Sequence, residues 1–201
     1  KFTNNAVKTK KFISSNNFLL ISQFDKSNSN LNNFYIKLLI SLNLYFCNSD
    51  KKLNILLRSK NSFLQKEEIE FYRKFFRFNC IFQKTSNWKK SYEKLDKFEN
   101  IIFMHSTLGY EAISRKKKVA IFSPKKVGNL SYWFGWPAPI QKRYSFFSAK
   151  NSGFDEIKRV LNNVKNCSQS NWEKKHYMKV KDHLYLNKNN TKLKKVIFNS
   201  L

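Results

Sequence analysis

Short apolar runs of strand length alternate with helix-length segments from residue 17 to residue 123, and this alternation limits the fold more than any other feature. The strand-length runs are residues 17–24, 52–58, 79–83, 99–107 and 118–123. The helix-length segments between them are residues 31–47, 65–76, 88–98 and 108–117. Strands that alternate with helices through short connections form parallel sheets with both faces covered. We therefore predict an α/β fold: a Rossmann-like, open, mostly parallel sheet with helices on both faces.

The pattern changes after residue 124. Beyond it come an aromatic loop with Trp133 and Trp136, a short apolar run at 144–148, a helix from a Ser152–Asp155 capping box to Lys165, and a helix at 170–181. The whole chain has 201 residues, the size of one domain. We divide it into a polar segment at 1–16, a Rossmann-like domain at 17–186 and a Lys-rich tail or helix at 187–201.

Several classes of protein are disfavoured. A membrane-spanning helix needs about 20 uninterrupted apolar residues, and Lys37 already interrupts the longest apolar run. The three cysteines, Cys47, Cys80 and Cys167, are far apart, which predicts neither a zinc site nor a disulfide framework. We expect no metal and a reducing, cytoplasmic location. The chain starts at Lys1 without an apolar leader, which fits a piece of a longer protein.

The net charge of +26 suggests a polyanionic partner. However, 33 of the 39 basic residues are Lys, whereas specific recognition of phosphates and bases favours Arg. The excess is also spread, with +11 over residues 1–100 and +15 over residues 101–201. The joint richness in Lys, Asn, Phe, Ile and Leu is typical of a composition imposed by A/T-rich coding DNA. The charge is also compatible with peripheral contact with an anionic membrane. Nucleic acid is the less expected partner.

Ligands of open parallel sheets bind at the carboxyl ends of the strands, so residues that follow strands are site candidates. The segment 105–113 lies where a strand passes into a helix. Ser106 and Thr107 can cap this helix, whose positive N-terminal end favours a phosphate, and Gly109 lets a ligand approach the backbone. Glu111, one turn further, can accept hydrogen bonds from a ribose diol. The same residues also fit a capped helix that binds nothing.

Three further side chains are candidates for the same site. Arg58 ends a strand and either clamps a phosphate or pairs at the sheet edge. His105 is either an acid or base or a hydrogen-bonded structural histidine. Lys125 either closes over a phosphate or belongs to a solvated run of charge. No catalytic residue is predicted.

Residues 100–124 (NIIFMHSTLGYEAISRKKKVAIFSP) combine a Ser-Thr-x-Gly-x-Glu-Ala turn, a basic linker and a Lys-Val-Ala-Ile-Phe strand. This stretch resembles the donor-binding half of GT-B glycosyltransferases, which have two Rossmann domains. More closely, it resembles the bacterial surface-carbohydrate biosynthesis transferases. The likeness continues through the loop Tyr132–Pro137 and the helices from Phe154 to Lys181. Before residue 100 only the alternation of strands and helices agrees.

The resemblance implies a nucleotide-sugar-dependent glycosyltransferase of cell-surface polysaccharide biosynthesis. This chain would be its carboxy-terminal, donor-binding domain, without the acceptor domain. Ser106, Thr107 and Gly109 would then face the phosphates of the donor, and Glu111 its ribose. The donor substrate would be a nucleotide sugar without a separate cofactor, and the acceptor a glycan or a lipid-linked sugar at the inner face of the cell membrane. Three alternatives stay open: a sugar-nucleotide epimerase of the same fold, a basic nucleic-acid-binding protein, and a degenerate or truncated paralogue with a scaffolding role.

Overall fold

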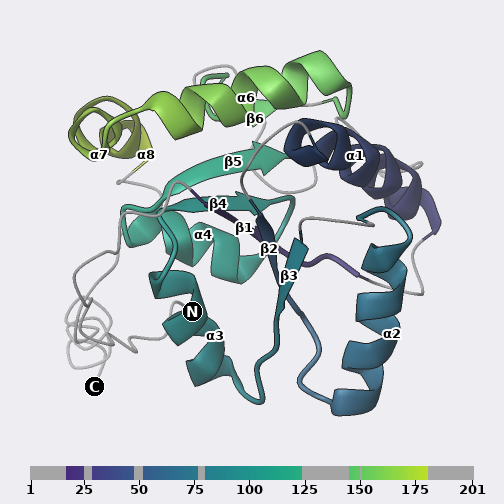
Figure 1. The fold of residues 1–201 in the computed structure, drawn as a ribbon. Coiled ribbons are helices and arrows are strands. Elements are labelled where there is room, and N and C mark those ends of the chain that lie inside the picture. The colour runs from purple at the N-terminus through teal and green to yellow at the C-terminus, as the bar shows by residue number, and fades with distance from the viewer. Residues whose placement is uncertain are drawn as a thin grey trace, which may run out of the picture.

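A computed structural model describes residues 17–24, 29–47, 52–76, 80–123, 145–149 and 151–180 (Figure 1). The strands of this part are β1 (Phe18–Ile21), β2 (Leu53–Leu56), β3 (Cys80–Gln83), β4 (Asn100–Phe103), β5 (Lys118–Phe122) and β6 (Ser148–Ala149). They form one sheet in the order β3-β2-β1-β4-β5-β6, and every pair is parallel. The predicted α/β fold with an open parallel sheet is therefore confirmed.

Helices cover both faces of this sheet. They are α1 (Ser29–Cys47), α2 (Ser62–Arg73), α3 (Trp88–Asp96), α4 (Thr107–Ser114), α6 (Phe154–Asn166), α7 (Gln169–Asn171), the π-helix η1 (Trp172–Tyr177) and α8 (Met178–Val180). Helices α1, α2 and α6 lie on one face, and α3 and α4 lie on the other (Figure 1). This two-sided arrangement buries the central strands: every residue of β1, β2, β4 and β5 is buried, as parallel sheets require.

Helix α2 begins three residues before its predicted start at residue 65. Asn61 is the N-cap, and its Oδ1 accepts hydrogen bonds from the backbone N–H groups of Phe63 and Leu64 at 2.8 and 3.4 Å. The carboxylates of Glu67 and Glu68 therefore lie in the second turn. A helix that began at residue 65 would place them in its first turn, as the order of acidic and basic residues predicts. That prediction was wrong, because the Asn61 cap starts the helix at Ser62.

The predicted Ser152–Asp155 capping box is also wrong. Helix α6 begins at Phe154 with Gly153 as its N-cap, and no side chain caps it. The Ser152 carbonyl instead accepts a hydrogen bond from Ser41 Oγ of α1 at 2.9 Å. This contact ties the start of α6 to α1, so tertiary contact decides the helix start here.

The helix predicted at 170–181 is present as the continuous run α7, η1 and α8, with a π-helical middle. Trp172 opens the π turn, is fully buried and packs its ring against Phe147 with centroids 5.3 Å apart. His176 stacks on Phe146 with centroids 3.9 Å apart. Burial, followed by the charges of Lys179 and Lys175, lowers the pKa of His176.

Three features of the sequence analysis lie outside the described residues: the predicted domain limits at 16/17 and 186/187, the candidate Lys125, and the aromatic loop with Trp133 and Trp136. Among the helices that are described, none has the length and apolar character to cross a membrane.

Candidate functional site

A pocket of about 390 Å³ opens at the carboxyl end of the sheet, where the strand order reverses between β1 and β4. Segments that follow β1, β2 and β4 form its walls, together with the first turns of α3 and α4. Connections on the two sides of such a reversal diverge, which leaves a crevice between them. The pocket is therefore a consequence of the topology.

Four of the predicted site residues line this pocket: Arg58, His105, Ser106 and Thr107. Ser106 is the N-cap of α4, but its side chain makes no capping hydrogen bond. The first N–H groups of a helix have no partner within the helix. The start of α4 therefore presents backbone donors, two hydroxyls and the positive end of the helix dipole beside the pocket.

The sequence-based prediction missed Lys60, which lines the pocket two residues after Arg58. Its Nζ donates hydrogen bonds to Thr85 Oγ1 and Ser91 Oγ, both at 2.7 Å. Among the described residues, no carboxylate lies within ion-pair distance of this ammonium. Burial lowers the pKa of Lys60, while the nearby charge of Glu68 raises it. Its position just after a strand was the signal that could have found it.

Glu68 of α2 lies under the pocket and is fully buried. Its Oε1 accepts hydrogen bonds from Ser22 Oγ, which follows β1, and from the backbone N–H of Arg58 at 2.9 Å. Its Oε2 accepts one from the backbone N–H of Ser59 at 3.2 Å. Tyr72 Oη donates to Ser22 Oγ at 2.7 Å. One carboxylate thus holds together the loops after β1 and β2, which carry part of the pocket's polar lining.

Charge is one-sided in this pocket. Two basic side chains, Arg58 and Lys60, and the half-buried His105 line it, and no Asp or Glu is among its described lining residues. Arg58 Nη1 also donates to the Phe24 carbonyl at 3.3 Å, which places the guanidinium between the loops after β1 and β2. The described residues hold no cluster of three or more metal-ligating side chains. This arrangement favours an anion, and phosphate in particular.

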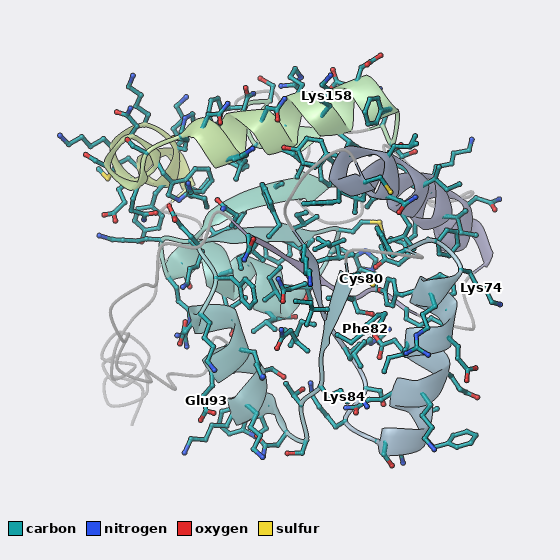
Figure 2. The ribbon with its side chains drawn as sticks, viewed as in Figure 1. Lys74, Cys80, Phe82, Lys84, Glu93 and Lys158 are labelled. Atoms are coloured by element: carbon teal, nitrogen blue, oxygen red, sulfur yellow. The ribbon has the colours of Figure 1, made fainter. Side chains whose placement is uncertain are left out.

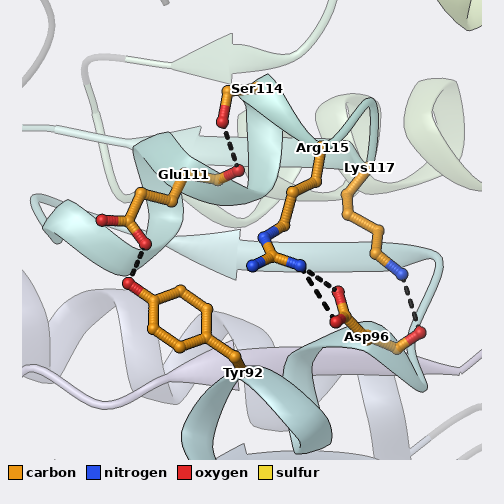
Figure 3. A network of polar contacts seen from close by, with 6 residues as sticks. All are labelled: Tyr92, Asp96, Glu111, Ser114, Arg115 and Lys117. Atoms are coloured by element: carbon orange, nitrogen blue, oxygen red, sulfur yellow. Dashed lines mark hydrogen bonds and ion pairs between the residues drawn. The ribbon is translucent and has the colours of Figure 1, made fainter. Parts of the chain in front are cut away.

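Glu111 does not line the pocket. Its buried carboxylate accepts a hydrogen bond from Tyr92 Oη of α3 (Figure 3). Burial, followed by this hydrogen bond, raises the pKa of Tyr92. The structure therefore brings Glu111 to the interface between α3 and α4, and its predicted contact with a ribose stays a prediction.

Gly109 packs against the sheet rather than lining the pocket. A Cβ at this position would lie 2.3 Å from Cγ of the buried Phe103 ring. The absence of a side chain lets α4 sit close to β4, which is one established use of glycine in Rossmann folds. A contact between Gly109 and a ligand stays a prediction.

The interface between α3 and α4 also holds a second polar network (Figure 3). Arg115 Nη1 donates to both carboxylate oxygens of Asp96 at 3.1 and 3.0 Å. Lys117 Nζ donates to the Asp96 carbonyl at 2.8 Å, and the Lys117 side chain is almost fully buried. Burial lowers the pKa of Lys117 from 10.5 to about 8, against the opposing charge of Asp96.

This lowered pKa predicts a pH-dependent stability. Between pH 8 and pH 10.5 the unfolded chain holds the Lys117 proton while the folded chain has lost it, so the free energy of unfolding rises with pH in this window. Across this pH window, the free energy of unfolding of the unsubstituted protein should rise by about 1 kcal/mol relative to that of Lys117→Met. This figure allows for solvent screening of the charge. Urea unfolding at pH 7 and pH 10.5 measures this gain. A gain of the same size relative to the exposed-site control Lys97→Met would refute the assignment to Lys117.

A family model described as "putative O-antigen biosynthesis protein" matches residues 1–200. No curated protein matches the chain. The match confirms the surface-carbohydrate context that residues 100–124 predicted. Its description names that process and names neither a glycosyltransferase nor a GT-B architecture.

Proposed function

Because the chain belongs to the O-antigen biosynthesis protein family, we propose that it is the donor-binding domain of a nucleotide-sugar-dependent glycosyltransferase. The observation that carries this proposal is the pocket at the strand-order reversal, where Arg58, Lys60 and the start of α4 converge without a carboxylate among the described lining residues. Polysaccharides are built from activated sugars whose leaving group is a phosphate. A preorganised phosphate site is therefore what this process requires of a donor domain.

Catalysis in this proposal is positioning together with stabilisation of the leaving group. An acceptor oxygen forms a bond to the anomeric carbon, the bond from that carbon to the phosphate oxygen breaks, and the proton of the acceptor passes to a base. Negative charge then grows on the departing nucleotide phosphate. In this proposal Arg58, Lys60 and the N–H groups of α4, which line the pocket, stabilise that charge. The acceptor is a glycan or a lipid-linked sugar on the cytoplasmic side of the membrane.

Nucleotide binding should depend on Lys60. We expect Lys60→Met, which keeps the length of the side chain and removes its charge, to weaken binding by about ten- to a hundredfold, because a charged hydrogen bond to phosphate is lost. Calorimetry with UDP, GDP, CMP and ADP and their sugar conjugates at about 0.15 M salt measures this loss. Lys84→Met is the matched control, since Lys84 is exposed and does not line the pocket. Equal losses from both variants would refute a specific phosphate site.

Two further measurements distinguish the transferase from an epimerase and from a nucleic-acid-binding protein. An epimerase would convert the nucleotide sugar in the absence of any acceptor, and proton NMR of the incubated donor would detect the second epimer. A nucleic-acid-binding protein would bind no nucleotide sugar but would bind RNA with an affinity that falls steeply with salt. Either result would replace the transferase proposal.

A further inference from the structure

Two helix starts stand side by side at the mouth of the pocket. The segments 60–66 and 84–92 are joined by the hydrogen bonds of Lys60 to Thr85 and Ser91, and Gln65 Nε2 donates to the Thr85 carbonyl at 2.9 Å. We call these two segments the rim. Lys60 and Ser91 belong both to the rim and to the pocket wall, so whatever binds the rim lies next to the pocket.

The rim exposes large apolar side chains. Phe63 is 67% exposed, Trp88 is 55% exposed and Leu64 is 45% exposed. These three side chains belong to the first turns of α2 and α3. An apolar group of this size beside a polar pocket marks an interaction surface.

The rim is also strongly basic. It holds five lysines, Lys60, Lys66, Lys84, Lys89 and Lys90, and no Asp or Glu. Neither α2 nor α3 has an acidic residue in its first turn. Lysines at helix starts oppose the helix dipole, which costs stability, and two such dipoles add their positive ends to the rim. The lysines of the rim therefore lower helix stability and raise the local positive potential.

We propose that the rim docks onto an anionic lipid surface. Membrane-interface segments combine Trp and Phe at the level of the headgroups with surrounding Lys, as the rim does. Each Lys adds attraction to an anionic leaflet. A second copy of the chain is a poor partner, because a symmetric contact would bring the five lysines against one another. Nucleic acid is a poor partner for Leu64, which has no ring to stack on a base.

Docking by the rim would turn the mouth of the pocket toward the headgroups. If the chain is the donor domain proposed above, a lipid-linked acceptor then lies on the same side as the bound donor. This consequence rests on the proposed function. The docking itself rests only on the rim, so vesicle binding and nucleotide binding can succeed or fail independently.

Removal of rim lysines tests the electrostatic part. The probe is a vesicle of 70% phosphatidylcholine and 30% phosphatidylglycerol, and binding is measured by co-sedimentation. We expect Lys84→Gln with Lys89→Gln to weaken binding by about twenty-five-fold, because each lysine near an anionic surface contributes about fivefold. The control, Lys74→Gln with Lys158→Gln, removes the same charge elsewhere and should have little effect. Figure 2 shows Lys84 at the rim end of the molecule, Lys74 at the opposite end of α2 and Lys158 on α6.

Removal of apolar rim side chains tests insertion. We expect Phe63→Ser with Leu64→Ser to weaken vesicle binding by about tenfold. Ile40→Ser with Leu44→Ser, which alters two residues of α1 that are each 48% exposed, should leave it unchanged. Brominated lipids should quench the Trp88 fluorescence of the bound protein, and Trp88→Phe should remove that quenching. Circular dichroism checks that each variant folds.

Four outcomes would overturn the proposal. Equal binding to pure phosphatidylcholine vesicles would refute the electrostatic contribution. Equal losses of binding in the rim and control variants would refute the assignment of binding to the rim. RNA binding that is lost with the rim lysines and kept in Phe63→Ser with Leu64→Ser would make nucleic acid the partner. A dimer in solution that dissociates in that apolar variant would make a second copy the partner.

Discussion

Replacement of Glu68 by Ala should lower the free energy of unfolding by about 4 kcal/mol, as measured by urea unfolding. The buried carboxylate accepts hydrogen bonds from Ser22 Oγ and from the backbone N–H groups of Arg58 and Ser59. Each buried donor left without an acceptor costs about 1–3 kcal/mol, and three lose theirs together. Glu70→Ala is the matched control, because Glu70 is an exposed carboxylate of the same helix. A loss that does not exceed that of Glu70→Ala would contradict this account.

The same substitution should weaken nucleotide binding even in the fraction that stays folded. Glu68 does not line the pocket, but it holds the backbone from which Arg58 projects and the Ser22 hydroxyl on the pocket wall. Calorimetry under conditions where Glu68→Ala is folded separates the two effects. Unchanged affinity would mean that the loops keep their positions without the carboxylate.

The order of strands and helices could be predicted because the information is local. Strands β1, β2 and β5, within the runs at 17–24, 52–58 and 118–123, are buried on both faces of a parallel sheet, so most of their residues are apolar. The end of a strand then marks where a ligand site can form, and Arg58, Ser106 and Thr107 were found in this way. This reasoning needs no knowledge of which strands are neighbours.

Other parts of the site depend on contacts between distant segments. Whether Glu111 faces a ligand or a neighbouring helix depends on where α3 packs, and Tyr92 lies 19 residues away in the chain. The sequence indicates the burial of Glu68 only weakly. It shares one helix face with Gln65, Ile69 and Tyr72 at spacings of three and four, and all four residues are buried. A carboxylate on an apolar face signals a buried partner, but the identity of that partner comes only from the fold.

Gly109 shows how one residue type can serve two different needs. A glycine at a helix start beside a strand fits either close approach of a phosphate or close approach of the helix to the sheet. The structure shows the second: an added Cβ would lie 2.3, 2.4 and 2.7 Å from three carbons of the Phe103 ring. That ring is fully buried and also packs edge-on against Tyr110, with centroids 5.3 Å apart, so it cannot easily move aside.

Gly109→Ala should therefore lower the free energy of unfolding by about 3 kcal/mol, the upper range for overpacking a core. Gly153→Ala is the control, because its Cβ would meet only the exposed Asn151 side chain, at 3.2 Å, and should cost less than about 1 kcal/mol. Adding Phe103→Leu to Gly109→Ala should recover most of the loss, since it removes the ring that the new methyl group meets. Urea unfolding of Gly109→Ala, of Phe103→Leu and of the double variant gives the coupling energy between the two sites. Purely additive losses would show that Phe103 is not the reason for the glycine, and close helix packing would then no longer explain it.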